Sequence, residues 1–298
     1  MNDSYYGKPI LKAPAWSPVD IGGYLFLGGL AGASSVLAAG ADLSGRPGLA
    51  RAGKIAALGA ISASAVALVH DLGRPERFVN MLRVVKPTSP MSVGSWLLTA
   101  YGPAAGVAAA TSVTGLFPGI GRAATLGAGL LGPAIASYTA VLISDTATPA
   151  WHGGYREMPF VFVGSAASAA AGLGMLAANT AEAGPARRAG VFGAALETVA
   201  MHRMRSRLGV VAQTHHEGTA GKLLKAAEVL TISGALTGAL LGRRSRLAAA
   251  VAGAALLAGS ACTRLGVFHA GAQSAEDPKY TVAPQKAARA EVAGRPAG

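Results

Sequence analysis

Charged residues are scarce in this sequence. Only 13% of its 298 residues are charged, whereas 51% are hydrophobic and the mean hydropathy is +0.41. A typical soluble domain carries about 25% charged residues, so the deficit predicts an integral membrane protein. Aromatic residues are also few, at 6%, and glycine is abundant, with 41 residues. This composition suits helices that pack closely in lipid, although a soluble bundle rich in small residues would share it.

Cysteine is almost absent, with Cys262 as the only one in the sequence. A single thiol excludes an internal disulfide, an iron–sulfur cluster held by this chain and a Cys-rich zinc site. Cys262 lies in an apolar segment, and we interpret it as a small buried hydrophobic residue.

Acidic residues are outnumbered, with 14 Asp and Glu against 26 Lys and Arg, a net charge of +12. In a soluble protein this excess would suggest a nucleic-acid partner. Here the basic residues lie between apolar segments, where they set topology, so we predict no nucleic-acid partner. The N-terminus also lacks the apolar stretch of a cleavable signal peptide, and we expect the first apolar segment to direct insertion.

Eight apolar segments approach the length of about 20 residues that spans a bilayer. They cover 19–40, 50–70, 91–113, 122–144, 158–180, 186–203, 222–242 and 245–266. The sequence thus predicts an all-α integral membrane protein with eight transmembrane helices in two four-helix bundles. Segment six is the least apolar, because it contains Arg187, Arg188, Glu197 and His202. If it were interfacial, the number of spans would be odd.

These segments divide the chain into four predicted parts. They are a polar N-terminal segment (1–18), a first bundle that carries the functional site (19–145), a second bundle (146–272) and a polar, extended tail (273–298).

The polar residues are unevenly distributed between the two predicted membrane faces. Eight spans place residues 1–18 and the tail on one face, which we call the terminal face, together with the connections after spans two, four and six. All six histidines and 12 of the 14 acids fall on or near this face, and only Asp42 and Glu182 lie toward the opposite face. We therefore expect the terminal face to carry the chemistry or the partner surface.

Ionisable and aromatic side chains gather where the first four predicted helices reach the terminal face. Taken singly, each has an ordinary explanation: Asp20 as a helix cap, Trp96 as an interfacial aromatic residue, and Arg74 as a ligand of lipid phosphate. Their convergence nevertheless predicts a functional site, because ionisable groups at a membrane boundary are costly. The candidates are Asp20, His70, Asp71, Arg74, Trp96, Tyr138, Asp145 and His152.

Several motifs resemble the polysulfide reductase membrane-subunit family, often called NrfD-like. They are "HDLGRPERF" followed by "SPMSVGSW", together with "WSPVDIGGYLFLGGLAGAS", "SDTATPAWHGGYREMPFVFVGSAASAAAG" and "TRLGVFHAGAQSAEDPKYT", which extend the resemblance over residues 16–281. Val93 is a departure, because an aromatic residue is common at this place in the family.

The resemblance implies a haem-free and metal-free membrane anchor of eight helices that binds menaquinone in its first bundle. Such subunits exchange electrons with a four-cluster iron–sulfur protein, which works with a molybdenum or tungsten catalytic subunit. The family's quinone positions carry over to Asp20, Asp71 and Tyr138. The chain itself would not act on the soluble substrate of the complex, for which formate or a sulfur compound is the expectation.

The chemistry of a quinone matches the predicted cluster. A quinone needs hydrogen-bond partners for two oxygens, groups that exchange protons and an apolar slot for its tail. His70 and Asp71 are the candidate catalytic proton donors, and Tyr138 is a candidate donor to a quinone oxygen. Arg74 is expected to hold Asp71 ionised, and Asp20, Asp145 and His152 form the polar rim.

Three alternatives stay open at this point. The chain could be a purely structural anchor, or a secondary transporter, which would favour charges near the bilayer midplane. Glu197 and Glu228 are the charged residues closest to the predicted midplane. They could also form a proton path through the second bundle. A single haem at the terminal face is the third alternative, whereas a pair of stacked haems across the bilayer is excluded, because no histidine lies in the middle of a predicted span and the opposite face has none.

The expected location is the bacterial plasma membrane, in contact with its lipids. The opposite face has short and almost purely basic loops, such as the one that carries Arg243 and Arg244. A raw count favours the reverse orientation, because 17 of the 26 Lys and Arg fall on the terminal face and nine on the opposite face. Short basic loops weigh most in setting topology and face the cytoplasm, so the terminal face is expected to point outward.

Overall fold

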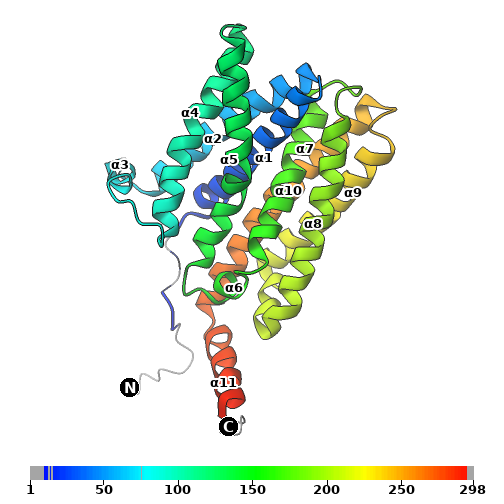
Figure 1. The fold of residues 1–298 in the computed structure, drawn as a ribbon. Helices are drawn as coiled ribbons and strands as arrows, with labels where there is room; N and C mark the ends of the chain where they lie inside the picture. The colour runs from blue at the N-terminus through cyan, green and yellow to red at the C-terminus, as the bar shows by residue number, and fades with distance from the viewer. Residues whose placement is uncertain (1–9, 13, 15, 75, 294–298) are drawn as a thin grey trace, which may run out of the picture.

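The computed structural model describes residues 10–12, 14, 16–74 and 76–293, and this part of the chain is helical (Figure 1). Eight helices have 20 residues or more. They are α1 (Pro18–Leu43), α2 (Pro47–Asp71), α4 (Pro90–Thr114), α5 (Pro118–Ser144), α7 (Met158–Ala177), α8 (Gly184–Leu208), α9 (Gly218–Leu240) and α10 (Arg246–Glu276).

Each of the eight predicted apolar segments corresponds to one of these long helices. Six of them, α1, α2, α5, α7, α9 and α10, are long and apolar enough to cross a membrane by length and composition. The predicted all-α membrane protein is therefore supported. The two remaining helices, α4 and α8, are as long but are not among these six, so the count of eight spans stays a prediction.

Local sequence signals explain where the helices begin. Proline occupies the first turn of α1, α2, α4 and α5, where its missing N–H costs no hydrogen bond. Ser17 caps α1, because its Oγ accepts a hydrogen bond from the Asp20 N–H at 3.3 Å. Gly115 ends α4 with φ 74°, a left-handed conformation that glycine adopts without strain.

The helices pack in two sets that share a broad interface. Helix α1 packs against α2 and α5, and α4 packs against α5 and α2. Likewise α7 packs against α8 and α10, and α10 against α9. Helices α1 and α5 meet α7 where the two sets join, and the long, nearly side-by-side helices are visible in Figure 1.

Glycines make the closest helix crossings possible. A Cβ on Gly132 of α5 would overlap the carbonyl oxygen of Gly32 in α1. In the same way, a Cβ on Gly253 of α10 would overlap the carbonyl oxygen of Gly172 in α7. In lipid, such small residues let helix backbones approach and gain van der Waals contact. The abundance of glycine in the sequence therefore has a direct use in packing.

Short helices lie at one end of the molecule. They are α3 (Glu76–Met81), α6 (Pro149–Gly153), the 3₁₀ helix η1 (Gly209–His215) and α11 (Lys279–Ala293). The expected extended tail from residue 273 is wrong for the described residues, because α10 continues to Glu276 and α11 follows. The tail is rich in Ala, Lys, Arg, Gln and Glu, which favour helix over extended backbone.

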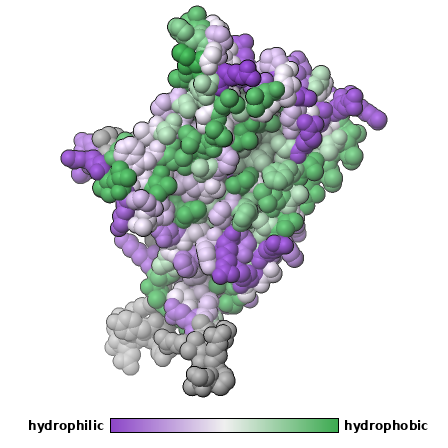
Figure 2. Space-filling view, viewed as in Figure 1, coloured by the Kyte–Doolittle hydropathy of each residue, from purple (hydrophilic) through white to green (hydrophobic). Residues whose placement is uncertain are grey.

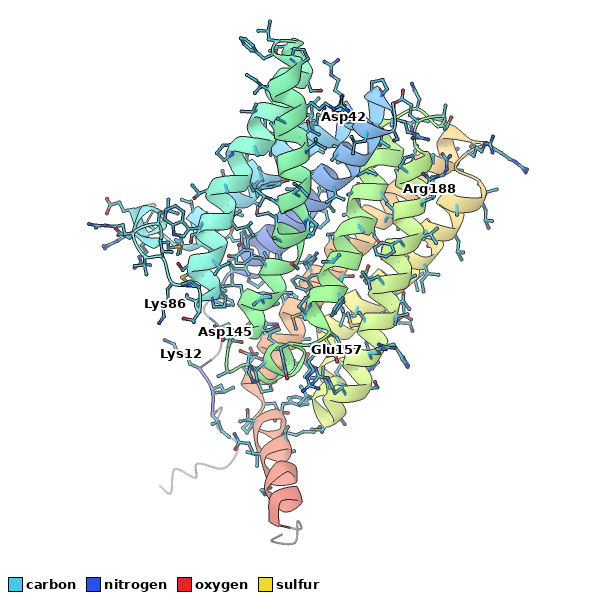
Figure 3. The ribbon with its side chains drawn as sticks, viewed as in Figure 1. Lys12, Asp42, Lys86, Asp145, Glu157 and Arg188 are labelled. Carbon is cyan, nitrogen blue, oxygen red and sulfur yellow. The ribbon has the colours of Figure 1, made fainter. Side chains whose placement is uncertain are left out.

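The terminal face predicted from the sequence corresponds to this end. Asp145, Glu157 and Lys86 lie near it in Figure 3, whereas Asp42 and Arg188 lie at the other end. The space-filling view has hydrophobic side chains over the middle of the long helices and hydrophilic ones gathered toward the ends (Figure 2). This distribution is typical of a protein that crosses a bilayer.

Candidate functional site

Asp20 and His70 meet at the terminal face. Asp20 lies in the first turn of α1 and His70 in the last turn of α2, and antiparallel packing of these helices brings the two together. His70 Nδ1 lies 3.1 Å from Asp20 Oδ2. The His70 side chain is 77% exposed and that of Asp20 is 23% exposed, so the pair is accessible to a proton from solvent. A pair this exposed adds little stability, which leaves both groups free for chemistry.

Asp71 helps to fix the start of α1. Its Oδ1 accepts a hydrogen bond at 3.1 Å from the backbone N–H of Ser17, the residue that caps α1. This contact joins the end of α2 to the beginning of α1. Asp71 therefore holds the element that carries Asp20, and Ser17 is a partner that the sequence analysis did not identify.

Tyr138 lies between three helices, deeper than the Asp20–His70 pair. The hydroxyl of Tyr24 in α1 donates to the Tyr138 hydroxyl at 3.0 Å. The Tyr138 ring occupies the space that a side chain at Gly94 of α4 would need. Tyr24 was also missed from the sequence, although it lies four residues after Asp20 and hence on the same face of α1.

The remaining predicted site residues are spread along the terminal face. Trp96 is 42% exposed, and its Nε1 donates to the Val84 carbonyl at 3.4 Å in the loop before α4. Arg74 and Asp145 are exposed. His152 lies in α6, with Nδ1 3.1 Å from the carbonyl oxygen of Ser144.

The structure thus brings part of the predicted cluster together. Asp20 and His70 are in contact, Asp71 anchors the start of α1, and Tyr138 is joined to α1 through Tyr24. Within the described residues, no hydrogen bond links Trp96, Asp145 or His152 to any of these groups.

A shallow, mainly apolar surface depression of about 490 Å³ lies along the last turns of α2. Ala65, Val66, Val69 and Gly73 line it with His70. Of the predicted site residues, His70 is in this lining, whereas Asp20 and Tyr138 are not.

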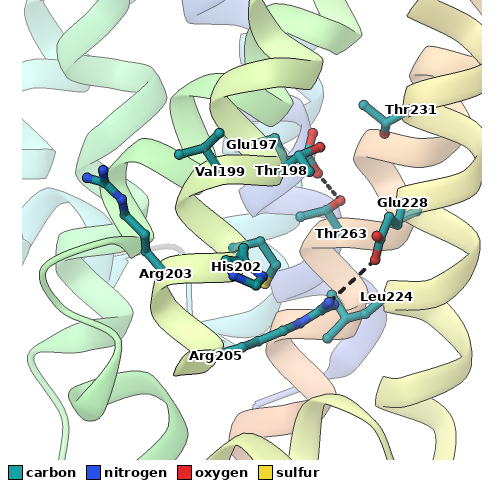
Figure 4. Close-up of a pocket in the computed structure, with 12 residues that line it drawn as sticks. Glu197, Thr198, Val199, His202, Arg203, Arg205, Leu224, Glu228, Thr231 and Thr263 are labelled. Carbon is teal, nitrogen blue, oxygen red and sulfur yellow. Dashed lines mark hydrogen bonds and ion pairs between the residues drawn. The ribbon is translucent and has the colours of Figure 1, made fainter. Parts of the chain in front are cut away.

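A second polar site lies inside the other helix set. Glu197 of α8 is 6% exposed and accepts a short hydrogen bond from the Thr263 hydroxyl of α10, while its Oε2 has no partner within the described residues. A cavity of about 310 Å³ adjoins it (Figure 4). Glu228 and Arg205 also line this cavity, with 3.4 Å between Oε2 of Glu228 and Nη1 of Arg205.

Arg264 is the largest residue that the sequence analysis missed. It is fully buried in α10, donates to the Phe162 carbonyl at 2.5 Å, and lies 3.8 Å over the Phe162 ring. An arginine inside an apolar segment is itself a signal, because such a charge is costly in a membrane unless it is paired.

Among the described residues, no group of three or more His, Cys, Asp or Glu side chains is arranged to hold a metal ion.

Comparison with known families identifies the segment that builds this site. Residues 12–111 match the family model described as polysulphide reductase, NrfD. Over these residues, about a third of the chain, the match confirms the resemblance predicted from the motifs. The NrfD match spans α1, α2 and α4, which carry Asp20, His70, Asp71 and Trp96. It ends before α5, so Tyr138 lies outside it. No curated protein matches the chain.

Proposed function

We propose that this chain is the quinone-reactive membrane subunit of a respiratory redox complex. The observation that carries the proposal is the Asp20–His70 pair, 3.1 Å apart, at the ends of helices that match the NrfD family. The family suggests a membrane subunit of a redox complex, and the apolar surface of α2 beside His70 is compatible with a ligand that has an apolar tail.

The ligand that fits this site best is menaquinone. A quinone bound there would supply two-electron, two-proton chemistry. His70 and Asp20 would exchange protons with solvent at the terminal face, and the Tyr138 hydroxyl would donate to a quinone oxygen. Asp71 would position Asp20 through its contact with Ser17, and it is a second proton donor in this proposal.

The expected partners follow from the same family. A four-cluster iron–sulfur protein would dock on the terminal face, where electrons leave or enter the quinone site. A molybdenum or tungsten subunit would act on the soluble substrate, formate or a sulfur compound. Neither haem nor metal is proposed for this chain, which would cross the bacterial plasma membrane eight times with the terminal face outward.

Purification of the native complex tests this proposal. We expect mass spectrometry to find an iron–sulfur protein and a molybdoenzyme with the chain, and we expect electron transfer to a soluble menaquinone analogue. His70→Gln and Asp71→Asn should lower that transfer at least tenfold in complexes that still assemble, because proton transfer by a placed side chain contributes about 10²–10⁴-fold. Unchanged transfer in both variants would favour a purely structural anchor.

We also propose a proton path through the α8–α10 region. The unpartnered Oε2 of Glu197, which adjoins a cavity with the Glu228–Arg205 pair, favours it. Because Oε2 of Glu197 has no partner within the described residues, this carboxyl group can take up and release a proton without breaking an ion pair.

Glu197→Gln tests the path in vesicles that contain the complex. We expect quinone-linked electron transfer to continue while the accompanying pH change across the membrane is lost. An unchanged pH response in an assembled variant would rule the path out. Loss of solute uptake together with normal electron transfer would instead indicate a secondary transporter.

A further inference from the structure

An apolar groove separates the two helix sets on the half of the molecule away from the terminal face. Its volume is about 470 Å³. Helices α1, α5, α7 and α8 all contribute to its lining, including Ala33, Val36, Gly132, Pro133, Ala167 and Phe192. It lies away from Asp20, His70 and Tyr138, and it belongs neither to the proposed quinone site nor to the Glu197 cavity.

The groove exists because small residues bring α1 and α5 together while leaving room beside them. Gly32 and Gly132 meet backbone to backbone. The adjacent lining residues Ala33, Ala136 and Ala167 have short side chains that cannot fill the space between α5 and α8. Because the lining is almost entirely apolar, the natural occupant at membrane depth is a hydrocarbon chain.

Two arginines line the same groove. Arg188 in the first turns of α8 is exposed and lies at the end of the molecule that carries Asp42 (Figure 3). Arg46, just before α2, donates from Nη1 to the Ser44 carbonyl at 3.2 Å. Within the described part of the chain, neither guanidinium forms an ion pair with a carboxylate.

The acids near this end already have partners. Asp42 Oδ1 lies 3.4 Å from Lys54 Nζ, and Glu182 Oε2 accepts the Leu49 N–H at 3.0 Å. Neither acid forms an ion pair with Arg46 or Arg188 within the described residues, so both guanidinium groups are open to an anion beside the apolar groove. Guanidinium groups bind phosphate through paired, charge-assisted hydrogen bonds.

The geometry points to a binding site for an anionic phospholipid. One acyl chain occupies the groove between α1, α5, α7 and α8, and the phosphate lies between Arg46 and Arg188. Basic pockets between transmembrane helices select anionic headgroups, because a zwitterionic lipid brings no net charge to meet the arginines. The bound lipid would also close the seam where the two helix sets meet.

Native mass spectrometry of the purified full chain, with any partners that remain bound, tests this site. We expect one retained phosphatidylglycerol-type lipid, and we expect added phosphatidylglycerol to raise the melting temperature more than phosphatidylcholine does. Arg46→Gln with Arg188→Gln should weaken retention by about fivefold per arginine. Arg244→Gln, an exposed arginine at the same end that does not line the groove, should leave it unchanged.

A second variant separates the groove from general surface charge. Ala167→Phe places a large side chain in the groove and should remove the lipid while both arginines remain. Equal effects of the two lipids, or equal loss in Arg244→Gln, would show that only non-selective surface lipid is bound. A quinone in place of the phospholipid in the native spectrum would also overturn the proposal.

Discussion

At the scale of single residues, the candidate site joins a carboxylate–imidazole hydrogen bond near the surface to a buried pair of phenols. The Asp20–His70 pair faces solvent, whereas Tyr24 is 2% exposed and its hydroxyl is occupied by Tyr138. This arrangement offers proton exchange at the surface and a hydrogen-bond donor at depth.

The Tyr138 hydroxyl can be tested by its removal. In Tyr138→Phe we expect the apparent affinity for a quinone analogue to fall about three- to tenfold, the effect of losing one hydrogen bond. Titration of electron-transfer rate against quinone concentration measures it. The matched control is Tyr101→Phe, which removes a hydroxyl 2.7 Å from Ser35 Oγ in another part of the first helix set. Equal weakening in both variants would indicate a general effect on packing.

His215 should make stability depend on pH. This side chain in η1 is 2% exposed, and burial, with the positive charges of Arg205 and His216, lowers its pKa to about 3. An unfolded histidine titrates near pH 6.5, so between about pH 6.5 and 3 the unfolded chain binds a proton that the folded chain does not. Stability should be full above about pH 6.5 and should fall as the pH drops below it.

Melting temperatures of the detergent-solubilised protein at pH 7.5 and 5 measure this dependence. We expect His215→Gln to flatten the decrease seen in the wild-type protein. His202→Gln, which changes an exposed histidine, should keep the wild-type slope. An identical slope in wild type and His215→Gln would show that another group is responsible.

The sequence predicted residues of the site only where neighbouring helix ends determine position. Asp20 and His70 could be paired because a short connection between two spans makes them antiparallel neighbours. Tyr24, Ser17 and Arg264 were missed, because their contacts depend on helix rotation and on loop conformation. The pattern of polar and apolar residues along the sequence does not determine helix rotation or loop conformation.

At the scale of elements, glycine contacts determine how closely α1 and α5 cross. Gly132→Ala would place a Cβ against the Gly32 carbonyl oxygen, so we expect a loss of about 1–3 kcal/mol in the free energy of unfolding. Gly127→Ala in the same helix is the control, because a Cβ there meets nothing within 4 Å. The control should be neutral or stabilising, by up to about 1 kcal/mol.

Thermal unfolding in detergent compares the two variants. A lower melting temperature for Gly132→Ala than for Gly127→Ala supports the close crossing. Equal melting temperatures would mean that α1 and α5 do not meet at Gly32 and Gly132.

The existence of the long helices could be predicted, but their ends and the tail could not. The length of an apolar segment predicts a membrane-spanning helix. The Ser-Pro pairs at 17–18 and 89–90 indicate where two of the helices begin. The segment predicted as 245–266 continues as α10 to Glu276, because its last turns are polar yet helix-favouring. The helical α11 was missed for the same reason, since low hydropathy outside a span does not distinguish helix from extended chain.

At the scale of the whole molecule, the two faces have different properties. The terminal face carries the Asp20–His70 pair, α3, α6, η1 and α11, whereas the opposite face carries unpaired arginines and the apolar groove. The sequence predicted this division from the placement of acids and histidines. The groove could not be predicted, because it depends on how four helices pack against each other.

The most direct test of the account is to map where a quinone head binds. A photoreactive menaquinone analogue would be cross-linked to the assembled complex, and the labelled peptides identified by mass spectrometry. We predict labelling of residues 16–24, 65–74 and 137–145 at the terminal face, and competition by unlabelled menaquinone. Labelling confined to the Glu197 cavity or to the groove at Arg188, or no competable labelling of the chain at all, would contradict the account.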